Sequence, residues 1–141
     1  MKFTNICPVF LVDDVRRTVE FYVSVLGFSY ANYFDKIDNF ATVYRDSVEI
    51  VLVQKKHGEI ENNTLKYGNG FDIYIDIDTI FGTDEIYEKY KKKGVNILRT
   101  PRMTDYGSYE FVFKDIDGRD IGIGLIKGKD VYFLNSNKKS A

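Results

Sequence analysis

Hydrophobic and polar residues follow the same succession of patterns twice along this chain. In the first cycle, the alternation over Phe3–Val12 predicts a strand, and Asp13 and Asp14 are natural caps for a helix after it. That helix has one apolar stripe and ends at Gly27, because glycine readily takes the left-handed conformation that closes a helix. The stripe consists of Val15, Val19, Tyr22 and Leu26, and the strands predicted next are Phe28–Tyr33, Ala41–Tyr44 and Val48–Val53.

The second cycle follows a polar segment, Gln54–Asn69, which we predict to be a loop between two halves of the chain. The alternation over Phe71–Ile77 predicts a strand, and Thr83 or Asp84 is expected to cap a second helix that ends at Gly94. The remaining predicted strands are Val95–Leu98, Tyr109–Phe113 and Ile121–Leu125.

The repeat predicts the fold class. We expect an α+β fold in which two βαβββ modules form a curved, mostly antiparallel sheet around a concave cavity, with the helices outside. Units of about 60 residues bury too little core alone, so the modules should pair, within one chain or between chains. We predict a single domain over residues 1–127, with module 1 at about 1–56 and module 2 at about 68–127, and a polar tail over 128–141.

Charge and composition exclude two classes of partner. The 20 basic and 21 acidic residues nearly cancel, so no overall field favours nucleic acid or an anionic membrane. The apolar runs have the length of strands and are shorter than the roughly 20 residues of a membrane helix. The single cysteine, Cys7, and the lack of a secretion signal in Met1–Pro8 lead us to expect a cytoplasmic protein.

Two strings of sequence carry a resemblance to a known family. LVDDVRRTVEFYVSVLGF, with Asp14, Phe21-Tyr22 and Leu26-Gly27-Phe28, resembles the opening of the glyoxalase, bleomycin-resistance and extradiol-dioxygenase superfamily, whose fold is called vicinal oxygen chelate. Tyr106-Gly107 and EFVFKDIDGRDIGIG resemble the same family's closing strands and turn, with Ile116 in place of the turn's usual proline. The resemblance covers nearly the whole chain and implies the two-module fold.

Enzymes of that family bind a divalent metal inside the curved sheet. The resemblance places the four ligand positions at Cys7, Val51, Asp72 and Gly122. Valine and glycine have no side-chain donor, and a catalytic zinc site normally needs three protein ligands. Moving two positions back along their strands, to Glu49 and Asp120, keeps the same face but displaces each donor by about 6–7 Å. We therefore expect no metal ion and no other cofactor.

Strand alternation also predicts what faces the cavity. Acidic and aromatic side chains dominate it, which suits a cationic, flat, partly aromatic ligand; the alternative is that the acids lie in water and the aromatic rings simply pack. For the strand near Tyr109, either Tyr109, Phe111 and Phe113 or Glu110 and Val112 face inward. The predicted ligand-binding residues are Glu49, Asp72, Tyr74, Tyr44, Tyr109, Phe111 and Arg102.

These observations favour a binding protein over an enzyme without deciding between them. Cys7 has a single possible histidine partner, His57, in the predicted loop, so we assign no catalytic residue. A proline at the second position of the first motif, Pro8 here, is similar to the bleomycin-resistance branch of the family, whose members sequester drugs without metal catalysis. We expect a metal-independent, homodimeric protein that sequesters a cationic aromatic drug or metabolite. Two alternatives remain: a metal-dependent lyase, isomerase or dioxygenase of the same superfamily with atypical ligands, and a regulatory module with a closed pocket.

Overall fold

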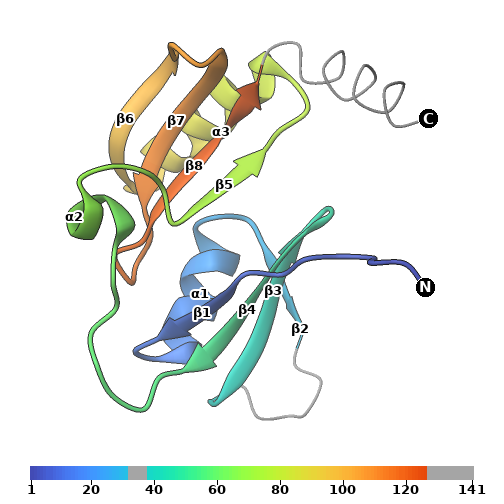
Figure 1. Ribbon diagram of the computed structural model, residues 1–141, viewed down its shortest axis with the longest axis vertical. Helices are drawn as coiled ribbons and strands as arrows, with labels where there is room; N and C mark the ends of the chain where they lie inside the picture. The colour runs from blue at the N-terminus through green and yellow to red at the C-terminus, as the bar shows by residue number, and fades with distance from the viewer. Residues whose placement is uncertain (32–37, 127–141) are drawn as a thin grey trace.

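The computed structural model describes residues 1–31 and 38–126 and folds them into two βαβββ modules joined by a short helix (Figure 1). The element order confirms the predicted α+β class. The end of the predicted strand Phe28–Tyr33 and the predicted tail lie outside the described residues. The elements are β1 (Val9–Val12), α1 (Val15–Ser24), β2 (Ser29–Ala31), β3 (Phe40–Arg45), β4 (Val48–Gln54), α2 (Asn63–Tyr67), β5 (Ile73–Asp76), α3 (Ile80–Lys92), β6 (Asn96–Met103), β7 (Ser108–Lys114) and β8 (Asp120–Ile126).

Each module forms its own four-stranded sheet. The strand orders are β1-β4-β3-β2 and β5-β8-β7-β6. The first strand of each module runs parallel to the last, and every other pair is antiparallel. No strand pairing joins the two sheets in the described ranges, so the single curved sheet that we expected is not formed there by hydrogen bonds. β1 and β5 are consequently edge strands.

The three helices in the described ranges are short, and none is long and apolar enough to cross a membrane. α1 begins as predicted, with the Asp14 carboxylate accepting a hydrogen bond from the Arg17 N–H at 3.2 Å. The prediction for α3 was wrong by one turn: the Thr79 hydroxyl accepts from the Gly82 N–H at 2.9 Å, and the helix starts at Ile80. The Thr79 cap stabilises α3 by about 1 kcal/mol, which offsets the similar penalty of having Gly82 inside the helix.

The predicted inter-module loop contains α2, which the hydrophobic pattern did not show. The Asn62 side chain accepts from the Leu65 N–H at 2.9 Å, and Gly68 closes the helix at a φ of 81°. Five residues are too few to display a helical period, so only these two caps could have indicated it. In the second module, β6 runs on through Pro101, which is tolerated because β6 is an edge strand with an irregular register.

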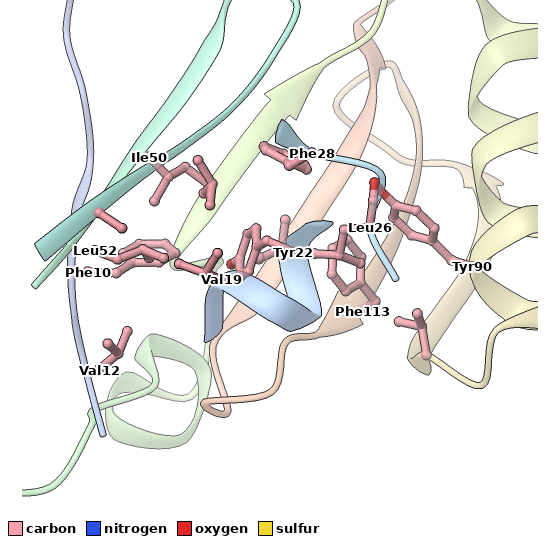
Figure 2. Packing of buried hydrophobic residues seen from close by; sticks show 14 of the residues in the cluster. Phe10, Val12, Val19, Tyr22, Leu26, Phe28, Ile50, Leu52, Tyr90 and Phe113 are labelled. Carbon is pink, nitrogen blue, oxygen red and sulfur yellow. The ribbon is translucent and has the colours of Figure 1, made fainter. Parts of the chain in front are cut away.

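The two modules share one hydrophobic core, formed by the helix-facing sides of both sheets (Figure 2). Tyr22 and Leu26 from α1 pack there with Tyr90 of α3 and Phe113 of β7, and all four are at most 3% exposed. The Tyr90 hydroxyl donates to the Leu26 carbonyl at 2.7 Å, which joins the two modules directly. Burial raises the pKa of Tyr90 to about 12, so this hydroxyl remains a donor at neutral pH.

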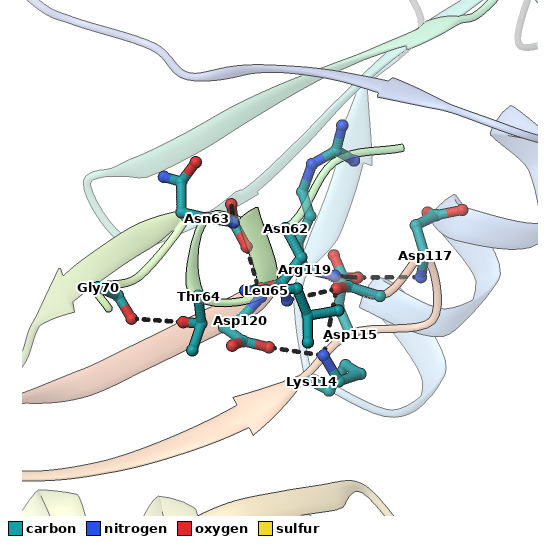
Figure 3. Close-up of polar contacts among 12 residues, drawn as sticks. Asn62, Asn63, Thr64, Leu65, Gly70, Lys114, Asp115, Asp117, Arg119 and Asp120 are labelled. Atoms are coloured by element: carbon teal, nitrogen blue, oxygen red, sulfur yellow. Dashed lines mark hydrogen bonds and ion pairs between the residues drawn. The ribbon is translucent and has the colours of Figure 1, made fainter. Parts of the chain in front are cut away.

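The turn between β7 and β8 holds the second module against α1. Asp115, 6% exposed, accepts the Tyr22 hydroxyl at 2.7 Å with one carboxylate oxygen. Its other oxygen accepts the N–H groups of Asp117 and Arg119 at 2.9 and 3.0 Å (Figure 3). The Thr18 hydroxyl also donates to Asp117 at 2.6 Å. Burial raises the pKa of Asp115, and these three hydrogen bonds oppose that shift because they favour the charged carboxylate.

Candidate functional site

Each sheet has a second face, opposite the one that its helix covers. Because the modules meet through their helix sides, both of these faces point away from the contact between the modules. The first open face is made of Cys7, Val9, Leu11, Thr42, Tyr44, Glu49, Val51 and Val53. The second open face is made of Asp72, Tyr74, Ser108, Glu110, Val112, Asp120, Gly122 and Gly124.

Two aromatic rings cover the centre of the second open face. A Cβ atom added at Gly122 would lie 2.9 Å from the Tyr74 ring and 3.0 Å from the Phe71 ring. At Gly124 it would lie 2.6 Å from the Tyr74 hydroxyl oxygen. That hydroxyl is 2.5 Å from the Ser108 hydroxyl, and the two rings meet edge to face at 5.5 Å. The glycines of β8 therefore leave room for these two rings, which together form an aromatic floor.

A buried carboxylate lies beside this floor. Glu110 is 3% exposed, and its Cβ lies 2.6 Å from the position that a Gly124 side chain would take. The Tyr106 hydroxyl, from the β6–β7 turn, donates a hydrogen bond to one Glu110 oxygen. Desolvation and the neighbouring Glu110 charge raise the pKa of Tyr106 to about 12. Among the described residues, no lysine or arginine forms an ion pair with Glu110.

The structure divides the predicted ligand-binding residues between the two open faces. Tyr44, 43% exposed, and the half-buried Glu49 lie on the first. Asp72 and Tyr74 lie on the second, and Arg102 is exposed on β6 opposite Glu110. The chain itself does not bring the two groups together.

The structure corrects the placement of Tyr109 and Phe111. Both lie on the helix side of β7: Phe111 is fully buried 5.6 Å from the Tyr87 ring. The Tyr109 hydroxyl donates to Asp84 of α3 at 2.6 Å. The pairing of Glu110 with Gly124 fixes the alternation in β7, so Glu110 and Val112 are the residues that face outward.

The residues at the family's metal-ligand positions do not fit a metal ion. Val51 has no donor atom, and the Phe71 and Tyr74 rings occupy the space at Gly122. The two oxygens of the Asp72 carboxylate accept hydrogen bonds from the backbone N–H groups of Asn63 and Asp120, at 3.0 and 2.7 Å. Both oxygens are therefore engaged in holding the backbone. Nowhere in residues 1–31 and 38–126 do three His, Cys, Asp or Glu side chains come together as a possible metal site.

The alternative donors at Glu49 and Asp120 are also engaged. The β1–β4 register places Glu49 beside Cys7, where desolvation and the carboxylate raise the pKa of the thiol. A thiol binds metal as the thiolate, so this environment disfavours coordination. Asp120, on the other sheet, forms an ion pair with Lys114 at 2.8 Å. Cys7 itself is half-buried.

Two clefts elsewhere on the molecule contain none of the predicted ligand-binding residues. One, of about 510 Å³, lies between α3 and the β3–β4 turn and includes Arg45 and Lys89. The other, of about 540 Å³, lies beside the segment between the modules and includes His57. The open faces remain the candidate site because the acidic and aromatic side chains gather there.

Sequence reasoning missed part of this arrangement. It placed Glu110 only as one of two alternatives and did not consider Phe71 or Ser108. The available signal was the pair Gly122 and Gly124. Two glycines on the same side of a strand have no side chains there, so bulky side chains from neighbouring segments can occupy the space above them.

Two βαβββ modules, each with a helix on one sheet face and an open second face, define the vicinal oxygen chelate class of α+β proteins. The model of the Glyoxalase/Bleomycin resistance protein/Dioxygenase superfamily matches residues 7–123, and the chain belongs to this family. A search of curated proteins finds no match to the sequence.

Solved structures confirm the fold. The bleomycin-binding protein from Streptomyces verticillus, in complex with copper(II)-bleomycin, is 21% identical, with a TM-score of 0.64 over 89% of this chain and 98% of that one. Lactoylglutathione lyase from Agrobacterium tumefaciens is 13% identical, with a TM-score of 0.65 over 86% and 92%. TioX from Micromonospora sp. ML1 is 13% identical, with a TM-score of 0.68 over 88% and 99%. The similarity thus spans a binding protein and an enzyme, and it does not choose between them.

Proposed function

We propose that this chain is a metal-independent small-molecule-binding protein of the bleomycin-resistance-like kind, which sequesters a cationic, partly aromatic drug or metabolite. The observation that carries this proposal is the second open face, where the Phe71 and Tyr74 rings lie beside a buried carboxylate that has no cationic partner among the described residues. Aromatic faces and a carboxylate together attract a flat organic cation.

Metal independence is supported by what replaces the ligands. The family positions hold a valine, a glycine under aromatic rings, and an aspartate bonded to backbone N–H groups. A metal-dependent lyase or dioxygenase would need at least three donors and an open coordination position. No feature of the described residues favours that alternative. The free thiol of Cys7 suits the reducing cytoplasm, where we place the protein.

We also propose that the protein is a homodimer in which one chain's first open face covers the other chain's second open face. Val9 and Leu11 are 55% and 43% exposed, and Phe3 and Ile6 before β1 are 97% and 90% exposed. Contiguous apolar exposure of this kind is typical of an interface. This pairing would bring Tyr44 and Glu49 to a site that the single chain leaves incomplete.

We further propose that residues 1–127 of each chain form one domain that contains both modules.

One observation favours the alternative of a closed, non-catalytic module. Phe71 and Tyr74 fill part of the face on which a ligand would lie. The hydrogen bond between the Tyr74 and Ser108 hydroxyls and the contact between the two rings hold them there. In a ligand-binding protein these rings form the floor of the site; in a closed module they would fill it completely.

A thermal-unfolding screen tests the function. We expect at least one cationic aromatic compound or cationic glycopeptide, such as metal-free bleomycin, to raise the melting temperature by several degrees at an excess of about 100 Kd, where linkage gives about 2.7 kcal/mol. Neutral analogues of each compound are the controls.

Light scattering on the same samples gives the oligomeric state, for which we expect two chains per particle. No shift with any compound at high excess would contradict the binding function and favour the closed module. A monomer at all concentrations would contradict the homodimer alone.

A further inference from the structure

Glu110 has an environment that an anion rarely occupies without a cation. It is 3% exposed, and its one hydrogen-bond donor among the described residues is the neutral hydroxyl of Tyr106. Buried charges are normally paired because their desolvation is unfavourable. The other polar groups nearby, Tyr74 and Ser108, bond to each other. A carboxylate can accept several hydrogen bonds, so Glu110 keeps accepting capacity beyond the one bond from Tyr106 for a ligand on this face.

Tyr106 is placed as a cover over this carboxylate. It lies in the β6–β7 turn, next to Gly107 at a φ of 83°, and 56% of it is exposed although its hydroxyl reaches the buried Glu110. Its hydroxyl interacts with Glu110 and with Thr104 of the same turn, so the exposed ring can be displaced without disturbing the core. The strand residues around it are fixed, since Thr104 and Ser108 bond to each other across the turn.

The geometry points to Glu110 as the anchor of the ligand's cationic group, which displaces Tyr106 and lies against the Phe71 and Tyr74 rings. This inference rests on the proposed binding function and names the chemistry of the site. A planar amidinium or guanidinium can donate two parallel hydrogen bonds to a carboxylate, one more than Tyr106 supplies. Such a group is also flat enough to extend over an aromatic floor, unlike a bulky quaternary amine. The ligand class is therefore an aryl amidine, guanidine or similar planar cation.

The two arginines near this site limit where the cation can lie. Arg99 lies 5.6 Å above the Phe71 ring, and Arg102 is exposed opposite Glu110 on β6. Neither forms an ion pair with Glu110, and the positive charge of both would repel a cation placed toward β6. The ligand's charge is thus expected on the β8 side of Glu110, over Gly124, where Tyr74 lies.

Calorimetric titration with benzamidine tests this assignment, with neutral benzamide and anionic benzoate as matched compounds. We expect benzamidine to bind and the other two to bind at least ten times more weakly. Glu110→Gln should weaken benzamidine binding by about 10- to 100-fold, the range expected for a charge-assisted hydrogen bond. Tyr106→Phe should leave binding equal or tighter, because it removes the competing donor. Glu88→Gln, an equal charge change on the exposed side of α3, should have no effect.

The outcomes separate this inference from the proposed function. If Glu110→Gln binds benzamidine as the wild type does, the anchor lies elsewhere although the binding function stands. Weaker binding by Tyr106→Phe would overturn its role as a displaceable cover. If the wild type binds neither benzamidine nor any compound of the thermal screen, the binding function itself fails. Glu110→Asp, which keeps the charge, replaces Glu110→Gln as the test if the glutamine variant does not fold, and it should bind more tightly than Glu110→Ala.

Discussion

Replacing Asp115 with alanine is expected to lower the free energy of unfolding by about 3–5 kcal/mol. The carboxylate accepts three hydrogen bonds at the joint between the modules, from the Tyr22 hydroxyl and the N–H groups of Asp117 and Arg119. Alanine would leave these buried donors without partners, and each unsatisfied group costs about 1–3 kcal/mol. Urea unfolding of the wild type and variant, with equal m-values, measures the difference.

Two variants provide the controls for Asp115. Asp115→Asn keeps an acceptor oxygen and the same shape, so it should lose only about 1 kcal/mol. Asp105→Ala removes a carboxylate from an exposed position in the β6–β7 turn and should change stability by less than about 0.5 kcal/mol. A loss below 1 kcal/mol for Asp115→Ala would show that the turn does not hold the modules together.

Gly124→Ala is expected to destabilise the protein by about 3 kcal/mol, at the upper end of the effect of overpacking. Its added Cβ would lie 2.4 Å from the Tyr109 carbonyl oxygen, a backbone atom that cannot rotate away. The same methyl group would push against Tyr74 and Glu110, so ligand binding should be lost along with stability. Thermal unfolding and a benzamidine titration on the same variant measure the two effects.

Gly122→Ala is the matched comparison two residues earlier in β8. Its closest neighbours, at 2.9 and 3.0 Å, are the side chains of Tyr74 and Phe71, which can shift. We expect a loss of only about 1 kcal/mol, with a larger change in ligand binding than in stability. If the two alanine variants were equally stable, the close approach of the Tyr109 backbone to Gly124 would be disproved.

Most of the fold follows from local signals in the sequence. The stripe of α1, its Asp14 cap and the alternation in the strands predicted the two modules because their spacing is regular over enough residues. α2 and the first turn of α3 could not be predicted in the same way. Each depends on a single capping side chain, Asn62 or Thr79, and α2 also depends on the hydrogen bond from the Asn63 N–H to Asp72, which no periodicity shows.

The candidate site was harder to predict than the fold. Alternation alone placed Tyr44, Glu49 and Tyr74 on sheet faces, but it could not fix which side of β7 faces outward, because every residue from Phe111 to Phe113 is apolar. Only the register with β8, where Glu110 pairs with Gly124, decides this. The separation of the two open faces is a tertiary property of how α1 packs on the second module, which no periodicity encodes.

The metal content of the purified, untagged protein tests the central claim most directly. The protein would be dialysed against trace Mn, Fe, Ni, Cu and Zn and then analysed by elemental mass spectrometry. We predict far less than one metal ion per chain, because the aromatic floor and the engaged carboxylates replace the family's ligand set. Near-stoichiometric retention that is lost in Asp72→Ala or Glu49→Ala would contradict this account and assign the chain to the metal-dependent enzymes of its family.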